Sequence, residues 1–220
     1  MENHIKRAPF FRGLFYFGGA VSVFDEAARS WDQKPERVET AKLVGSEIVS
    51  SVPISREWNV LDFGTGTGLL TLYLEPFVKE IYALDNSRGM VEVLREKLEN
   101  LKVKKVIPVL GSFETVNFNR RFDLVVSSMS IHHVKEVEKL FKWFSSVLKK
   151  GGYLAVADLE KEDGTFHRDN SEVYHFGFER EEIFNYMESA GIKPVEYKIV
   201  KKFLRNNREY PLFLAVGVKI

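Results

Sequence analysis

Residues 60–68 read VLDFGTGTG, a short apolar run that stops at three closely spaced glycines. The apolar run begins at residue 58 and predicts a strand, and residues 67–77 predict a helix. Glycine at such a turn adopts backbone conformations that other residues avoid, and it lets a ligand lie against the main chain. The stretch therefore predicts a ligand-binding turn after the first strand of an α/β fold.

The rest of the chain alternates strands with helices, apart from its last two strands. Helices are expected at 35–52, 87–101, 135–150 and 179–191, and the third of these is closed by Gly151 and Gly152. Further strands are expected at 79–85, 105–111, 122–128, 153–159, 192–203 and 209–219. A parallel crossover needs about a dozen linking residues, so the last two strands should form an antiparallel hairpin. We expect a Rossmann-like three-layer α/β sandwich with a seven-stranded, mostly parallel sheet and a C-terminal antiparallel hairpin.

Composition narrows the possible functions. The 220 residues include no cysteine, which excludes a disulfide scaffold, thiolate zinc sites, iron–sulfur clusters and a cysteine nucleophile. Lysine plus arginine (32) nearly equals aspartate plus glutamate (31), and this balance argues against a dedicated nucleic-acid binder.

The longest apolar run, residues 13–24, is too short to span a bilayer, and Asp25 and Glu26 follow it in place of a cleavage site. We expect a cytoplasmic protein without stable membrane insertion, with a signal peptide or a membrane-touching segment as less favoured readings.

Asp85 ends the second predicted strand, 21 positions beyond Gly64, where a carboxylate would bind a ribose diol. Dinucleotide sites favour G-x-G-x-x-G, whose helix N-terminus receives a pyrophosphate. This chain has G-x-G-x-G preceded by Asp62, and that carboxylate would repel a pyrophosphate. It suits a ligand with an ammonium group, such as the amino-acid end of S-adenosylmethionine. A nicotinamide-dependent oxidoreductase is the less favoured alternative.

At these residues the sequence resembles class I S-adenosylmethionine-dependent methyltransferases, of the broad small-molecule group related to the ubiquinone/menaquinone biosynthesis enzymes. The resemblance covers roughly residues 24–218. VLDFGTGTG matches the family's first motif and YALDNSRGM its second, while FDLVVSSMSIHHV and LKKGGYLAVAD match the fourth strand and the passage into the fifth. FDEAARSWD at 24–32 resembles the family's N-terminal cover over the cofactor. We therefore expect an extension at 1–23 and one domain at 24–220, divided into a helical cover at 24–56 and a catalytic core at 57–220.

The resemblance implies S-adenosylmethionine as cofactor and S-adenosylhomocysteine as product. Asp85 would hold the ribose hydroxyls, and GSFE at 111–114 matches the adenine-edge position, where the family often has an acidic residue in place of Ser112. The implied cofactor-binding residues are Asp62, Gly64, Thr65, Gly66, Gly68, Asp85, Asn86, Ser87, Met90, Ser112, Phe113 and Ser128.

The implied reaction is an in-line displacement, in which a general base helps only if the acceptor must lose a proton. The candidate bases are histidines: His132 follows the fourth strand, with His133 beside it, and His167 and His175 lie in the long segment 158–178, which could form a lid. We expect one member of the 132–133 pair to face the pocket and the other to pack. A purely structural role in the loops is the alternative for each histidine.

For two further clusters, one of acidic and one of aromatic side chains, we favour a structural role over a role in binding. Asp158, the acidic residues behind it and Asp169–Asn170 could bind a metal, but the fourth strand ends in serine where another acidic ligand would be expected, so we predict no metal. Aromatic side chains near the N-terminus could wall an apolar acceptor pocket or belong to the core. They are Phe10, Phe11, Phe15, Tyr16, Phe17 and Phe24.

The methyl acceptor is not fixed by these motifs. The fourth strand is followed by Ser-Met-Ser-Ile in place of the Pro-Pro tetrad of adenine-N6 enzymes, and the missing cysteines exclude cytosine-C5 and arsenite methyltransferases. We expect a small-molecule acceptor, no nucleic acid, and a monomer or homodimer. An RNA or protein methyltransferase, or a non-catalytic cofactor-binding module, remains open as an alternative.

Overall fold

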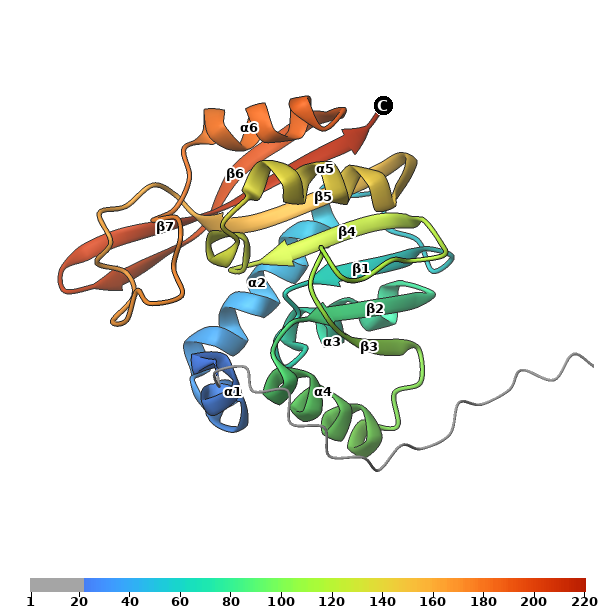
Figure 1. The fold of residues 1–220 in the computed structure, drawn as a ribbon, viewed down its shortest axis with the longest axis horizontal. Coiled ribbons are helices and arrows are strands. Elements are labelled where there is room, and N and C mark those ends of the chain that lie inside the picture. The colour runs from blue at the N-terminus through green and yellow to red at the C-terminus, as the bar shows by residue number, and fades with distance from the viewer. Residues whose placement is uncertain (1–21) are drawn as a thin grey trace, which may run out of the picture.

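The computed structural model describes residues 22–220, and in this part of the chain seven strands form one sheet (Figure 1). The sheet order is β3-β2-β1-β4-β5-β7-β6. The first five strands are parallel, and β7 runs antiparallel to both β5 and β6. The strands are β1 (Asn59–Phe63), β2 (Glu80–Asp85), β3 (Val106–Leu110), β4 (Phe122–Ser128), β5 (Leu148–Leu159), β6 (Ile192–Arg205) and β7 (Arg208–Lys219). The predicted architecture, including the C-terminal hairpin, is confirmed.

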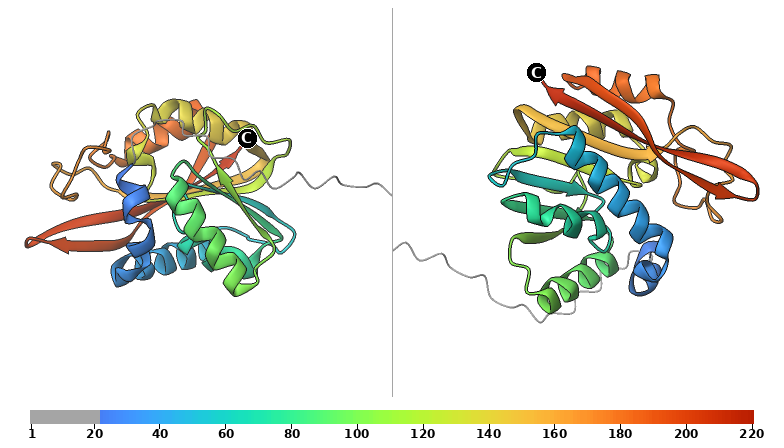
Figure 2. Two further views of the ribbon diagram at one scale, coloured as in Figure 1. Left: turned by 60° about the horizontal axis from the view of Figure 1, so that its bottom comes forward. Right: turned by 180° about the vertical axis from the view of Figure 1, so that it is seen from behind.

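Helices cover both faces of the sheet (Figure 2). The helices α2, α3 and α4 pack on one face, and α5 and α6 pack on the other. The helices are α1 (Val23–Ala27), α2 (Pro35–Ser51), α3 (Leu69–Leu74), α4 (Arg88–Leu101), α5 (Val137–Val147) and α6 (Arg180–Ser189), with 3₁₀ turns η1 (Ala28–Gln33), η2 (Glu75–Phe77) and η3 (Ile131–His133). In the described residues, none of the helices has the length and apolar character that crossing a bilayer requires.

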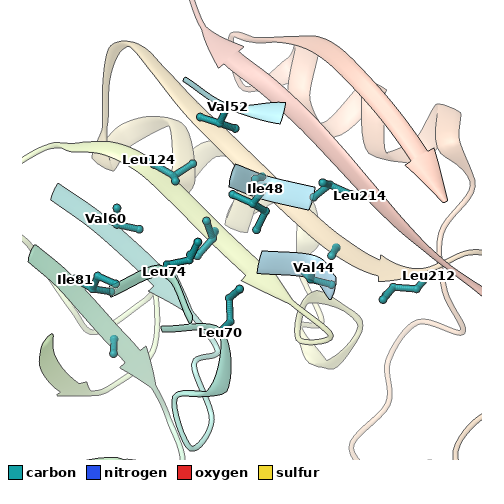
Figure 3. Packing of buried hydrophobic residues seen from close by; sticks show 14 of the residues in the cluster. Val44, Ile48, Val52, Val60, Leu70, Leu74, Ile81, Leu124, Leu212 and Leu214 are labelled. Atoms are coloured by element: carbon teal, nitrogen blue, oxygen red, sulfur yellow. The ribbon is translucent and has the colours of Figure 1, made fainter. Parts of the chain in front are cut away.

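Apolar side chains fill the space between helices and sheet (Figure 3). On one face, Ile48 of α2 and Leu74 of α3 are fully buried with Leu124 of β4. On the other face, Phe141 and Phe144 of α5 are fully buried in a second cluster. Burial of such side chains provides the main driving force for this layered packing.

The sheet order reverses between β1 and β4, and this reversal determines where a ligand can bind. The turn after β1 leads to α3 on one face, whereas the segment after β4 leads to α5 on the other. A crevice therefore opens at the C-terminal ends of these two neighbouring strands, as in other open α/β sheets.

Several helix boundaries differ from those predicted by one to three residues, and two of the differences have a clear physical reason. The helix expected at 135–150 ends at Val147, because Leu148 is buried and pairs with Phe122 at the start of β4. The pairing register then shifts before Tyr153, so the two predicted stop glycines lie within β5. The helix expected at 67–77 begins at Leu69, because Gly68 takes a left-handed conformation with φ +83°.

The segment between β5 and α6 folds back against the core. The Glu162 carboxylate accepts hydrogen bonds from the backbone N–H groups of residues 164, 165 and 166. The backbone N–H groups of Tyr174 and His175 donate to the His132 carbonyl, which attaches the segment to η3. In Figure 1 the segment lies beside the protruding end of the β6–β7 hairpin, and the guanidinium of Arg205 donates to the Phe166 carbonyl there.

The aromatic residues Phe10, Phe11, Phe15, Tyr16 and Phe17 and nearly all of the predicted extension lie outside the described residues. Phe24 lies inside them: its ring packs edge-on against His133, with 4.9 Å between ring centroids. This position is at the cavity described below, and not in either core cluster.

Gly177 controls how the segment returns to the sheet, since its φ is +67° and an added Cβ would lie 2.1 Å from the Glu160 carbonyl oxygen. Gly151 has a similar φ of +75° but open space at the Cβ position, so it is a matched control. Gly151→Ala should lower the free energy of unfolding by about 1–2 kcal/mol, the cost of left-handed backbone. Gly177→Ala should lower it by roughly a further 1–3 kcal/mol through overpacking. Urea denaturation measures both, and equal losses would contradict the predicted clash.

Candidate functional site

A cavity of about 1360 Å³ opens at the C-terminal edge of the sheet, beyond the ends of β1 and β4. Single-ligand pockets occupy roughly 300–1000 Å³, so this cavity has room for two ligands. One part, here called the glycine half, is lined by Gly64, Gly66, Asp85, Met90 and Ser112. The other part, here called the histidine half, is lined by His132, Phe166, His167 and Arg205.

The three glycines of the turn after β1 have left-handed backbones, with φ of +67°, +55° and +83°. A Cβ on Gly64 would lie 1.8 Å from the Ser130 hydroxyl, and one on Gly68 would lie 2.4 Å from Leu94. Gly64, Thr65 and Gly66 line the cavity, whereas Gly68 starts α3 and does not. The turn therefore exposes main chain to a ligand at its first two glycines.

Asp85 connects the turn to the end of β2. One carboxylate oxygen accepts from the Gly66 N–H at 2.7 Å, and the other accepts from the Ser87 N–H at 2.9 Å. Burial raises the pKa of Asp85, and the backbone hydrogen bonds oppose that shift. Each oxygen has two lone pairs, so capacity remains for a pair of hydroxyl donors.

Asp62 lies at the back of the glycine turn and is almost fully buried. Its Oδ2 accepts hydrogen bonds from the Thr65 hydroxyl at 2.9 Å and the Thr71 hydroxyl at 2.6 Å. Burial raises the pKa of Asp62 to about 6. The carboxylate still lines the cavity, so it can hold the turn in shape and present negative charge to a ligand.

The remaining predicted cofactor residues divide into two groups. Asn86, Met90, Ser112, Phe113 and Ser128 line the cavity. Ser87 does not: it caps α4 by accepting from the Met90 N–H and donates to Asp25. Glu114 also lines the glycine half, and its carboxylate accepts from the Ser112 hydroxyl at 2.9 Å. An acidic group is thus available two residues after the position where the family often has one.

The elements α1 and η1 lie across the glycine half and are attached through two carboxylates. Asp25 accepts from the Ser87 hydroxyl at 2.7 Å and from the Gly89 N–H at 2.8 Å. Asp32 accepts from the Thr67 hydroxyl at 2.6 Å and forms an ion pair with Lys97. Sequence reasoning missed both attachments, because the partners lie 35 to 65 positions apart in the chain.

His132 lies at the junction of the two halves and is 1% exposed. Its Nδ1 lies 2.6 Å from an oxygen of Asp158, which is itself fully buried. Burial alone would raise the pKa of Asp158, but the His132 ring lowers it, through its positive charge when it is protonated and through its hydrogen bond. The His132 Nε2 has no hydrogen-bond partner within the described residues. A proton held on Nδ1 by the carboxylate leaves a lone pair on Nε2.

His133 and His167 complete a cluster of imidazoles, with ring centroids 4.0 Å and 5.0 Å from that of His132. The Nδ1 of His133 lies 2.6 Å from the Glu172 carbonyl oxygen. Burial lowers the pKa of His133 to about 3 and that of His167 to about 4, so both rings are neutral at pH 7. Both histidines of the 132–133 pair line the cavity, whereas we expected only one of them there.

His175 does not line the cavity. Its Nε2 lies 3.0 Å from the Val134 carbonyl oxygen, and the ring helps to fasten the segment between β5 and α6. Of the three histidines predicted for catalysis, the structure therefore brings together His132 and His167. Asp158, the partner of His132, was considered in the sequence only as part of a polar cluster, because no local pattern links residues 26 positions apart.

The chain is similar in sequence and in fold to known methyltransferases. Residues 61–156 match the family described as methyltransferase domain. A relative from Schizosaccharomyces pombe, named an uncharacterized methyltransferase, is 33% identical over 154 residues, which cover 63% of this chain and 54% of the relative. The chain spans between about half and two thirds of the length of the first curated relatives it matches.

Solved structures share the fold. A SAM-dependent methyltransferase from Aquifex aeolicus superposes with a TM-score of 0.69 at 22% identity, covering 89% of this chain and 98% of that one. An S-adenosylmethionine-dependent methyltransferase from Clostridium acetobutylicum gives 0.67 at 18% identity, covering 90% and 100%.

The neutral His167 makes a testable contribution to acid stability. Its pKa is about 4 in the folded protein against an ordinary value of 6.5, so the unfolded chain binds its proton first as the pH falls. The native state should lose stability from this group between pH 6.5 and about 4. The variant His167→Asn lacks this group. Its free energy of unfolding should therefore rise relative to that of wild type as the pH falls through that range. Urea denaturation at several pH values measures the difference, and a difference that does not change with pH would contradict the assignment.

Proposed function

We propose that this chain, a member of the class I S-adenosylmethionine-dependent methyltransferase family, is an enzyme that transfers a methyl group to a small-molecule acceptor. One observation carries the proposal: a single cavity is lined by the glycine turn, by Asp85 and by His132, whose buried Nε2 has no partner within the described residues. The first half has the donors and acceptors that a nucleoside needs, and the second has an imidazole nitrogen without a protein partner.

The residues of the glycine half fit S-adenosylmethionine. Asp85 would accept from the ribose hydroxyls, and Glu114 or Ser112 would meet the adenine edge. The exposed main chain at Gly64 and Gly66, with Asp62 behind it, would hold the amino-acid end. When bound, the cofactor supplies a methyl group that is attached to its positively charged sulfur. The demethylated product, S-adenosylhomocysteine, is the leaving group.

His132 is the proposed general base for an acceptor that must lose a proton. Its Nε2 would take that proton, and the resulting imidazolium would be stabilised by the Asp158 carboxylate 2.6 Å from Nδ1. Asp158 also accepts from the backbone N–H of Ile131 at 3.1 Å, so the carboxylate is fixed before the acceptor arrives. His167, neutral and 5.0 Å away between ring centroids, would offer a second hydrogen-bonding group to the acceptor.

The shape of the histidine half favours a small molecule over RNA or protein. It is bounded by the elements α1 and η1, by the segment between β5 and α6, and by the end of the β6–β7 hairpin. Hydrogen bonds from Tyr174 and His175 to the His132 carbonyl hold that segment over the site. A cytoplasmic location and action as a monomer or homodimer are part of the proposal.

Asp85→Ala tests the cofactor site. The variant should lose about 1–3 kcal/mol of binding free energy for S-adenosylhomocysteine, the range for hydrogen bonds to a charged group. Glu80→Ala, at the opposite end of the same strand, removes an exposed ion pair with Arg120 and should leave affinity unchanged. Isothermal titration calorimetry measures both variants. Unchanged affinity in Asp85→Ala would show that the ribose is held elsewhere, and binding of NAD alone to wild type would overturn the proposed cofactor.

His132→Gln tests the proposed base. With methyl-labelled cofactor and a metabolite extract as the source of acceptor, the variant should transfer label about 100-fold more slowly or worse, as for loss of a positioned base. Its affinity for S-adenosylhomocysteine should stay near that of wild type, because His132 is not among the residues proposed to hold the cofactor. Full transfer activity in the variant would exclude His132 as the base.

A further inference from the structure

Five cationic side chains line the cavity: Lys135, which follows η3, and four others that lie close to one another at the histidine half. Lys34 and Arg37 come from the start of α2, Arg168 from the segment between β5 and α6, and Arg205 from the end of β6. The chain as a whole has a net charge of only +1, so this grouping is a local concentration of positive charge.

Two of these cations are held in place by aromatic rings. The guanidinium carbon of Arg37 lies 3.4 Å from the centroid of the Trp31 ring, and its Nη1 donates to the Trp31 carbonyl at 3.2 Å. The guanidinium carbon of Arg205 lies 3.7 Å from the centroid of the Phe166 ring. Stacking fixes the plane of a guanidinium and leaves N–H donors at its edge for a planar or tetrahedral anion.

The positive charge is only partly neutralised by the protein. Among the described residues, Arg205 pairs with Glu36 at 3.2 Å, and Lys34, Arg37 and Arg168 have no carboxylate at ion-pairing distance. Asp32 attracts Arg37 at longer range but is engaged by Lys97 and Thr67.

Two other acids line this half, and the carboxylate of each accepts a hydrogen bond from a backbone N–H group. Asp169 accepts from the Ser171 N–H, and Glu172 accepts from the Val23 N–H. The positive charge of Arg37 has the largest influence in lowering the pKa of Lys34, followed by burial and then by the charges of Arg168 and Arg205. The cations therefore repel one another, and a bound anion would relieve that repulsion.

Apolar surface lies between the cations and His132. Phe166 is buried, and its ring contacts both Phe203 and His167 at centroid distances of 5.2 Å and 4.9 Å. Trp31 and Tyr174 add further aromatic surface to the lining. Along the cavity the lining changes from cationic side chains to aromatic rings and then to the His132 imidazole. This order fits an elongated ligand with an anionic group at one end.

We propose that the methyl acceptor is an anionic small molecule with an apolar or aromatic body, whose carboxylate or phosphate is held by Arg37 and Arg205 with Lys34 and Arg168. The description of this ligand as the methyl acceptor rests on the proposed function, but the anion site does not. The amino-acid end of the cofactor also carries a carboxylate, so the experiment has to separate that source from the acceptor.

The test is calorimetry on the full chain saturated with S-adenosylhomocysteine, with benzoate and phenyl phosphate as anionic probes and benzamide as the neutral one. Both anions should bind at millimolar concentration, at least about tenfold more tightly than benzamide.

The double variant Lys34→Gln/Arg168→Gln should weaken anion binding by about tenfold or more, the loss expected for charged hydrogen-bond partners. Neither side chain donates a hydrogen bond within the described residues, so the double variant should keep its fold. The double variant Lys104→Gln/Arg121→Gln removes two exposed cations just before β3 and β4, at the opposite edge of the sheet. It is the charge-matched control and should bind as wild type does.

The cofactor is titrated separately, into the same proteins without the probes. S-adenosylhomocysteine and 5′-methylthioadenosine, which lacks the amino-acid end, should each bind the double variant as they bind wild type. A loss confined to S-adenosylhomocysteine would assign the cations to the cofactor's carboxylate and overturn the proposal. Equal binding of benzoate and benzamide, or no anion binding, would also overturn it. Failure of S-adenosylhomocysteine to bind wild type would instead contradict the proposed function, and the anion preference is then measured on the unsaturated protein.

Discussion

The absence of a side chain at Gly64 is the constraint on which the site depends. An added Cβ there would lie 1.8 Å from the hydroxyl of Ser130, so only glycine lets the segment after β4 lie directly against the turn after β1. That segment carries His132, and the turn carries the exposed main chain of Gly66. The close contact between Gly64 and the Ser130 side chain thus brings the proposed base and the proposed cofactor site into a single cavity.

Buried and half-buried carboxylates then fix the parts around this contact, each in a different way. Asp85 joins the ends of two strands through the Gly66 N–H, and Asp25 attaches α1 to the start of α4. Asp158 orients the His132 ring and accepts from neighbouring backbone N–H groups. A buried carboxylate is costly unless it is hydrogen-bonded, so these groups indicate where the fold needs fixed geometry.

The sequence predicted the fold well because strand and helix periodicity are local properties. The order of elements, the terminal hairpin and the glycine turn all follow from short windows of residues. The end of α5 was wrong by three residues, because Leu148 pairs with Phe122, a contact that no local window contains. In the site, Asp85 could be expected from its spacing to the glycines. The His132–Asp158 pair and the stacking of Arg205 on Phe166 could not, because 26 and 39 positions separate the partners and only the folded sheet edge unites them.

A crystal structure of the full chain with S-adenosylhomocysteine would show whether the glycine half holds the cofactor. We expect the ribose hydroxyls on the Asp85 carboxylate and the amino-acid end at Gly64 and Gly66. The sulfur should face the histidine half, with no protein side chain between it and the Nε2 of His132. A nucleoside bound outside the glycine half, or a sulfur directed away from His132, would contradict the account.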